Sequence, residues 1–194
     1  MGKISQLTFA ATIAGFALAG TQAAAAVITF DSLTGSNGDT FTSTSESGFD
    51  ITATGGNWFE AHLNGAPVPS IFGNSDLGEI TLTRTGGGLF TFQGADFDDA
   101  TGGTLPWSIA GLLNGVSVFS TDGFASEQFE TFDSTSGDSV FDTLVFTLDG
   151  TGTSSYNIDN IRVTEALAAV PLPASAALML LGLAGIGAAS RRKG

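Results

Sequence analysis

Short runs of alternating apolar and polar residues recur along the middle of this chain, separated by clusters of Gly, Ser, Thr, Asp and Asn. A period of two is typical of strands that place one face on a core, and no stripe with the 3.6-residue helical period interrupts it. About ten strands without crossover helices predict an all-β fold, a two-sheet antiparallel β-sandwich. The predicted strands are 27–31, 49–54, 58–63, 79–84, 89–97, 107–113, 116–120, 129–132, 143–148 and 156–163.

The clearest turn in this pattern is Asn114-Gly115, which separates two apolar runs. Both residue types tolerate the positive φ that a type I′ hairpin requires. Alternation within 107–113 and 143–148 gathers the apolar side chains of each strand on one face, so we expect most of the 16 phenylalanines to be core residues. The Ser- and Thr-rich stretch 35–48 is predicted to be a polar loop or a poorly ordered edge.

The N-terminal end has the composition of a targeting segment rather than of a strand. It has a basic start at Lys3, an apolar run over 7–20 and four consecutive alanines at 23–26, which suit a signal-peptidase site. We therefore predict a cleaved signal helix over residues 1–26, with signal peptidase as a partner during export. A retained membrane anchor is the alternative, but the apolar run is short for a span.

The C-terminal end combines a proline-containing motif, an apolar stretch and a basic end. The prolines keep the motif extended, and the apolar stretch 174–189 would reach about 24 Å as a helix, enough for a thin bilayer. Basic residues beyond it favour a cytoplasmic C-terminus, which leaves residues 27–169 outside the membrane as the extracellular domain. The motif is Val170, Pro171, Leu172, Pro173 and Ala174, and the basic end is Arg191, Arg192 and Lys193.

This order of features over 170–194 resembles the PEP-CTERM sorting signals of Gram-negative bacteria, in the variant form with Val-Pro-Leu-Pro-Ala. The resemblance implies that the helix holds the protein transiently in the inner membrane, where an exosortase processes the tail. The mature protein then goes to the cell surface or to an exopolysaccharide matrix. Leu172 stands where the commoner motif has glutamate, so the cleavage site and the particular exosortase stay open. A plain C-terminal membrane anchor is the alternative.

The distribution of charge narrows the classes of partner. Between residues 27 and 169 lie all 19 acidic residues but only two basic ones, Arg84 and Arg162. A segment this acidic repels phosphate backbones, so nucleic acid is excluded as a partner. The chain contains no cysteine, which excludes disulfides, thiolate metal sites and thiol nucleophiles.

The acidic residues suggest calcium as a structural cofactor. Alternate carboxylates in an irregular segment at 96–99 offer hard oxygen ligands, and two further acids lie at expected strand edges. EF-hand spacing is absent, and solvated acids in turns are the alternative. The candidate ligands are Asp31, Asp96, Asp98, Asp99 and Asp159.

The last predicted strand, 156–163, contains an Asp-Asn-Ile triplet and resembles the closing strand of extracellular jelly-roll modules, including carbohydrate-binding ones. The resemblance implies a jelly-roll-like sandwich, an ion site that reaches Asp159, and exopolysaccharide as a partner. Trp58, Trp107 and Tyr156 are the candidate ligand-binding residues, because sugar rings stack on exposed flat aromatic faces. Core packing is the alternative for all three.

The sequence contains few residues in an arrangement suited to catalysis. The sole histidine, His62, lies two residues after Glu60 on the same strand face, which predicts an ion pair, and no serine lies in a nucleophile elbow. Carboxylate pairs for glycoside cleavage arise by chance in so acidic a domain. We expect a non-enzymatic surface or matrix protein with a structural or adhesive role; the alternatives are a carbohydrate-binding module and a glycoside-active enzyme. The carboxylates considered are Glu60, Asp96, Asp98, Asp99, Glu127 and Glu130.

Overall fold

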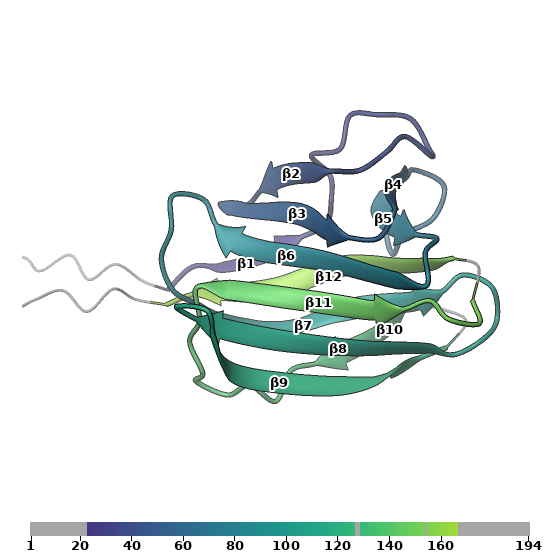
Figure 1. Ribbon diagram of the computed structural model, residues 1–194. Coiled ribbons are helices and arrows are strands. Elements are labelled where there is room, and N and C mark those ends of the chain that lie inside the picture. The colour runs from purple at the N-terminus through teal and green to yellow at the C-terminus, as the bar shows by residue number, and fades with distance from the viewer. Residues whose placement is uncertain (1–22, 127–128, 154, 167–194) are drawn as a thin grey trace, which may run out of the picture.

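Two six-stranded antiparallel sheets pack face to face in the computed structural model, which describes residues 23–126, 129–153 and 155–166 (Figure 1). We call them sheet A, with strand order β10-β7-β12-β5-β4 and β1 paired to β12, and sheet B, with order β2-β3-β6-β11-β8-β9. Sheet A contains β1 (Ala25–Ile28), β4 (Trp58–Ala61), β5 (Ser70–Gly73), β7 (Phe90–Asp99), β10 (Glu130–Asp133) and β12 (Tyr156–Glu165). Sheet B contains β2 (Ser43–Glu46), β3 (Phe49–Gly55), β6 (Leu77–Arg84), β8 (Leu105–Leu113), β9 (Val116–Ala125) and β11 (Thr143–Asp149).

The predicted all-β, two-sheet antiparallel sandwich is confirmed, and each predicted strand overlaps an observed one. The second half of the stretch 35–48 is not a loop but an edge of sheet B, because β2 lies there and pairs with β3. The turn between them, Ser47-Gly48, has φ values of 53° and 83°, as a type I′ turn requires. Asn114-Gly115 likewise has φ values of 51° and 78°, which confirms the predicted hairpin between β8 and β9.

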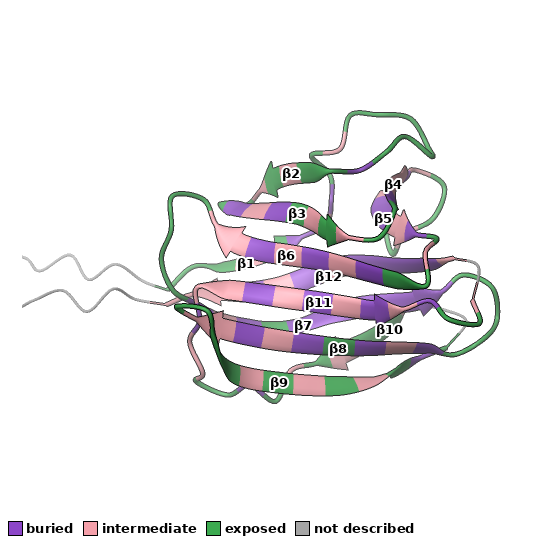
Figure 2. Cartoon of the chain, viewed as in Figure 1, coloured by how far each residue is buried: buried purple, intermediate pink, exposed green. Residues whose placement is uncertain are grey.

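Buried residues alternate with more exposed ones along the strands of both sheets (Figure 2). They form a core between the sheets that is rich in aromatic side chains. Phe90 contacts Phe49 and Phe141 edge to face, with ring centroids 5.2 and 5.0 Å apart, so both sheets share one aromatic cluster. Edge-to-face contacts are the favoured geometry for such pairs. The buried phenylalanines are Phe30, Phe41, Phe49, Phe90, Phe92, Phe97, Phe141 and Phe146.

The described chain enters and leaves the sandwich at the same end. Ala25 at the start of β1 pairs with Thr164 near the end of β12, and the Glu165 N–H donates to the Ala24 carbonyl (Figure 1). The predicted signal helix and sorting helix lie outside the described residues. Among the described residues there is no helix with the length and hydropathy needed to cross a membrane.

Candidate functional site

A row of four side chains crosses the outer face of sheet A, the face turned away from the core. Cross-strand pairing aligns Phe59 on β4 with Phe72 on β5, Phe72 with Asn157 on β12, and Asn157 with Asp98 on β7. The neighbours Ile158 and Phe97 point to the opposite side and are buried in the core. Alternation along the strands therefore produces a half-aromatic, half-polar row, which we call the outer row.

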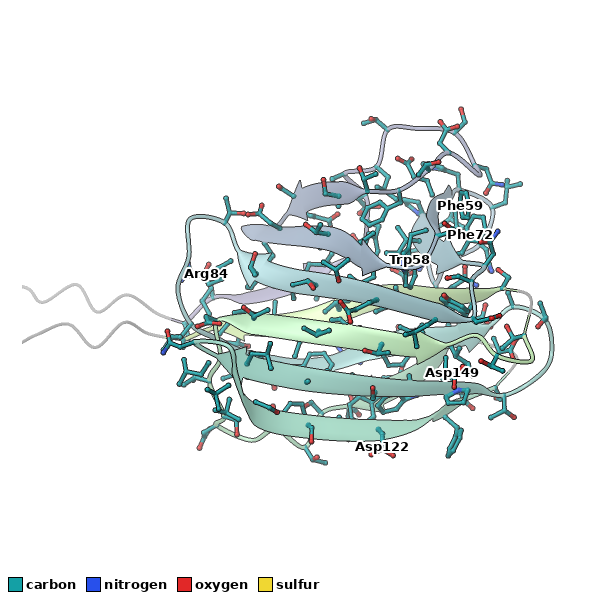
Figure 3. All side chains as sticks on the ribbon, in the orientation of Figure 1. Trp58, Phe59, Phe72, Arg84, Asp122 and Asp149 are labelled. Carbon is teal, nitrogen blue, oxygen red and sulfur yellow. The ribbon has the colours of Figure 1, made fainter. Side chains whose placement is uncertain are left out.

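The aromatic half of the outer row is a stacked pair. The ring centroids of Phe59 and Phe72 lie 5.1 Å apart with an interplanar angle of 28°, and both side chains are partly exposed (Figure 3). The polar half is nearly inaccessible: Asn157 is 1% exposed and its Nδ2 donates to Asp98 Oδ2 at 3.1 Å. Asp98 Oδ1 is buried and has no hydrogen-bond partner among the described residues.

The loop of residues 62–69 between β4 and β5, which we call the covering loop, lies against the polar part of this face. Asn64 Nδ2 donates to Asp98 Oδ2 at 3.4 Å, and the Ala66 N–H donates to Asp159 Oδ2 at 2.9 Å. Asn160 Nδ2 donates to the Ala66 carbonyl at 2.6 Å. Asp159, whose cross-strand partner on this face is Asp96, is completely buried beneath the covering loop.

Burial dominates the electrostatics of these acids. It raises the pKa of Asp159 to about 7, although N–H groups of Ala66 and Asn160 donate to the carboxylate and act in the opposite direction. Burial also raises the pKa of Asp98, partly offset by hydrogen bonds from Asn64 and Asn157. Both carboxyls therefore hold their protons to a higher pH than exposed aspartates do.

The five candidate calcium ligands are brought together only in part. Asp96, Asp98 and Asp159 share the outer face of β7 and β12, but Asp96 pairs with Arg162 at 3.0 Å. Asp99 is fully buried, its Oδ1 accepts from Thr101, and alternation along β7 places it on the other face. Asp31 is exposed and accepts a hydrogen bond from Thr29 Oγ1.

No group of three or more His, Asp or Glu side chains within 23–126, 129–153 and 155–166 is arranged to hold a metal ion. Calcium therefore stays a prediction from sequence. Melting curves of the protein in calcium and in chelator test it, because an ion bound by the native state alone raises the midpoint.

The three aromatic residues predicted to bind ligand are placed in the core. Trp58 is 1% exposed, Tyr156 0% and Trp107 7%, so none offers an exposed face of the kind that sugar stacking needs. Trp58 and Tyr156 pack edge to face at 5.4 Å, and the Trp58 Nε1–H donates to the Gly55 carbonyl at 2.9 Å. The expectation of an exposed platform at these positions is corrected: alternation turns Trp58 inward, and its neighbour Phe59 outward.

Trp107 lines a pocket of about 300 Å³ between the edges of the two sheets. Its walls come from β7, β8, β9 and β10, and Phe124 at its rim is 70% exposed. Glu130 contributes a carboxylate, but Oε1 and Oε2 already accept from Ser126. The pocket is lined by Phe97, Trp107, Phe124, Ala125, Glu130, Thr131 and Phe132.

The only histidine contacts the glutamate that the sequence pattern places beside it. His62 Nε2 lies 2.9 Å from Glu60 Oε2, and the same carboxylate accepts from the Gly35 N–H. The His62 N–H donates to Asn37 Oδ1, so the pair joins the start of the covering loop to residues 35–37. Glu127, another carboxylate considered for catalysis, lies outside the described residues.

Comparison with known proteins identifies the end of the chain. Residues 169–193 match the PEP-CTERM protein-sorting motif, which confirms the predicted resemblance of the tail. Such a signal implies export and surface association in Gram-negative bacteria, with exosortase processing. The tail itself lies outside the described residues. A search of curated proteins finds no match to this sequence.

Among solved structures, a DUF4465 family protein from Bacteroides caccae aligns with a TM-score of 0.47 at 11% identity, covering 74% of this chain and 100% of that one. A family 29 carbohydrate binding module from Piromyces equi aligns with a TM-score of 0.42 at 14% identity, covering 75% and 93%. TmCBM61 in complex with beta-1,4-galactotriose aligns with a TM-score of 0.39 at 9% identity, covering 62% and 90%. These similarities are loose and concern the fold.

Proposed function

We propose that this chain is an exported, exosortase-processed surface or extracellular-matrix protein with a structural or adhesive role and no catalytic activity. The observation that carries the proposal is the sorting motif at 169–193. The fold suits such a role, because β12 leads directly toward that tail and the chain enters the sandwich beside it. The opposite end of the sandwich, with the turns after β7 and β11, then points away from the attachment (Figure 1).

Export and processing are tested by the intact mass of the protein from a host with an exosortase and from the same host without it. We expect a mature form that lacks the leader and the tail beyond 170–174 only where the exosortase is present. A variant with Pro171→Ala and Pro173→Ala should retain its tail, because the motif is no longer held extended. A full-length tail on the unmodified protein in the exosortase host would contradict the proposal.

A second candidate function, binding of a neutral polysaccharide, is favoured by the outer row. Phe59 and Phe72 offer two stacked, partly exposed rings on the outer face of sheet A. Exposed flat aromatic faces are what a sugar ring stacks on. Acidic polysaccharides are disfavoured, because both basic residues of the domain are already paired: Arg84 with Glu165 and Arg162 with Asp96.

The test compares retention on neutral and acidic polysaccharide gels for the unmodified protein and for Phe59→Ala and Phe72→Ala. Each substitution should weaken neutral-glycan binding about tenfold, equivalent to about 1.4 kcal/mol. Phe124→Ala is the matched control, since it removes an exposed phenylalanine from sheet B. Equal retention of all four proteins would rule out the outer row as the binding surface.

A further inference from the structure

The pocket between β9, at the end of sheet B, and β10, at the end of sheet A, arises from small residues on β9. Cross-strand pairing with Trp107 and Leu105 places Gly123 and Ala125 on the inner face of β9. Packed sheets lie about 10 Å apart, so a glycine and an alanine leave part of the space between them unfilled. The Trp107 ring already lies over Gly123, where an added Cβ would collide with it. We call the remaining space, about 300 Å³ and bordered by Ala125, the edge pocket.

The inner wall of the edge pocket is aromatic and held in place by its own contacts. The rings of Phe97 and Trp107 stack with centroids 5.0 Å apart, and the Phe132 ring lies 4.6 Å from that of Trp107. An apolar cavity of about 150 Å³ can hold a benzene molecule, so the edge pocket has room for a ring and a short chain. Such a wall favours a ligand with an apolar body, because contact with it releases water from both surfaces.

One carboxylate faces into the gap beside this wall. Glu130 pairs with Phe97 across β10 and β7, so the two side chains share the face of sheet A that is turned toward sheet B. Glu130 Oε2 accepts from the Ser126 N–H at 3.0 Å, and Oε1 accepts from Ser126 Oγ at 2.8 Å. Because Ser126 directly follows β9, these bonds hold the carboxylate between the two sheet edges. Serine is neutral, so the charge of Glu130 is not compensated by this contact.

Glu130 has no basic partner within residues 23–126, 129–153 and 155–166, where every histidine and arginine pairs with another acid. The segment 27–169 holds 19 acidic residues and two basic ones, so its field attracts cations and repels anions. The edge pocket therefore has a charge that a positively charged ligand would complement. The salt bridges of the described residues are His62–Glu60, Arg84–Glu165, Arg162–Asp96 and Arg162–Asp133.

We propose that the edge pocket binds an organic ammonium ion, with its apolar body against Trp107 and Phe132 and its amine on the Glu130 carboxylate. Each carboxylate oxygen has two lone pairs and accepts one hydrogen bond from Ser126, so both oxygens can accept another from the amine. An anion would be repelled here, and a neutral ligand would cover the carboxylate without compensating its charge. A free amine and an amino sugar within a polysaccharide both present this chemistry.

The test titrates the exported protein with two amines and their uncharged counterparts: phenethylamine with phenethyl alcohol, and a glucosamine tetramer with its N-acetylated form. The NMR signals of the two tryptophan indole N–H groups are the readout, assigned with Trp58→Phe. We expect an amine to shift the Trp107 signal and not the Trp58 signal, because Trp58 Nε1 is bonded to the Gly55 carbonyl in the core. It should bind about tenfold more tightly than its uncharged counterpart. A shift with only one amine identifies the source as free or polysaccharide-borne.

Glu130→Gln should reduce the affinity for the amine about tenfold, to that of the uncharged counterpart. Asp122→Asn is the matched control, because it also removes one negative charge but from the solvent-exposed side of β9 (Figure 3). This variant should bind the amine like the unmodified protein. Equal losses in both variants, equal affinity for amine and uncharged counterpart, or an unshifted Trp107 signal with both amines would overturn the proposal. None of these outcomes bears on sorting or on the outer row, which intact mass and gel retention test separately.

Discussion

Asp159 is a fully buried carboxyl that accepts hydrogen bonds from two backbone N–H groups. Its burial makes the free energy of unfolding depend on pH in a definite direction. Its pKa rises from 3.8 to about 7 on folding, so the folded chain binds this proton more tightly than the unfolded chain does. The resulting stability is complete below pH 4 and is lost as the pH rises through 7. The shift corresponds to at most about 4 kcal/mol.

We therefore expect the free energy of unfolding to fall between pH 5 and pH 8, with a smaller fall in Asp159→Asn, as measured by urea denaturation. Asp122→Asn serves as the control, because it removes a carboxylate from an exposed position on β9. Its pH profile should follow that of the unmodified protein. If the free energy of unfolding varied with pH in the same way for all three proteins, ionisation of Asp159 would cost the folded state little free energy.

Trp58 gives a second test at the residue scale, because its burial predicts a structural role. Trp58→Ala removes a ring that packs against Tyr156 and leaves a cavity, at a cost of about 3–5 kcal/mol of stability. Phe124→Ala should change stability by less than about 0.5 kcal/mol, because that ring is 70% exposed. Chemical denaturation of both variants measures the difference. Similar losses would contradict the burial of Trp58.

The reversal of Trp58 and Phe59 shows what alternation can and cannot predict. Adjacent residues of a strand must point to opposite faces, so the sequence shows that one of these rings is buried and the other is not. Which one faces inward depends on the partner strand, and that partner is β5, which was not predicted. The outer row was missed for the same reason: it exists only once β4, β5, β12 and β7 are in register.

At the scale of elements, the predicted strands were those in which β-branched and aromatic residues alternate. Strand β2 was missed because its sequence, Ser-Thr-Ser-Glu, carries no apolar residue, and its pairing with β3 decides its structure. Strand β5 was missed because it has four residues and follows Pro69, yet it pairs on both sides, with β4 and β12. In both cases backbone hydrogen bonds to neighbouring strands stabilise a strand that the local sequence pattern does not predict.

The β8–β9 hairpin depends on the backbone of its turn, which gives a prediction for one glycine. Gly115 has a φ of 78°, and a Cβ there would meet no atom within 4 Å, so Gly115→Ala adds backbone strain alone. We expect a loss of about 1–2 kcal/mol in thermal or chemical unfolding. Asn114→Gly, at φ 51°, should be close to neutral. A neutral Gly115→Ala would mean that the turn changes type.

At the scale of the whole molecule, the excess of acids makes salt a stabilising agent. The segment 27–169 holds 19 acidic residues and two basic ones, and both basic side chains are already paired. Added salt screens the repulsion among the remaining carboxylates. We expect the melting temperature to rise between low and physiological sodium chloride, with little further change above that. A fall over the same range would show that the paired charges contribute more than the repulsion costs.

The position of β12 determines how the domain resists being pulled from a surface. A protein held through residues beyond Glu165 receives force at the end of this strand, along its axis. Strand β12 runs between β7 on one side and β1 and β5 on the other, so their hydrogen bonds, which lie across the strands, are strained together rather than one after another. A force that pulls on the tail therefore loads a central strand in shear. Shear breaks many hydrogen bonds at once, so it resists mechanical extraction far better than an edge strand that is peeled off bond by bond.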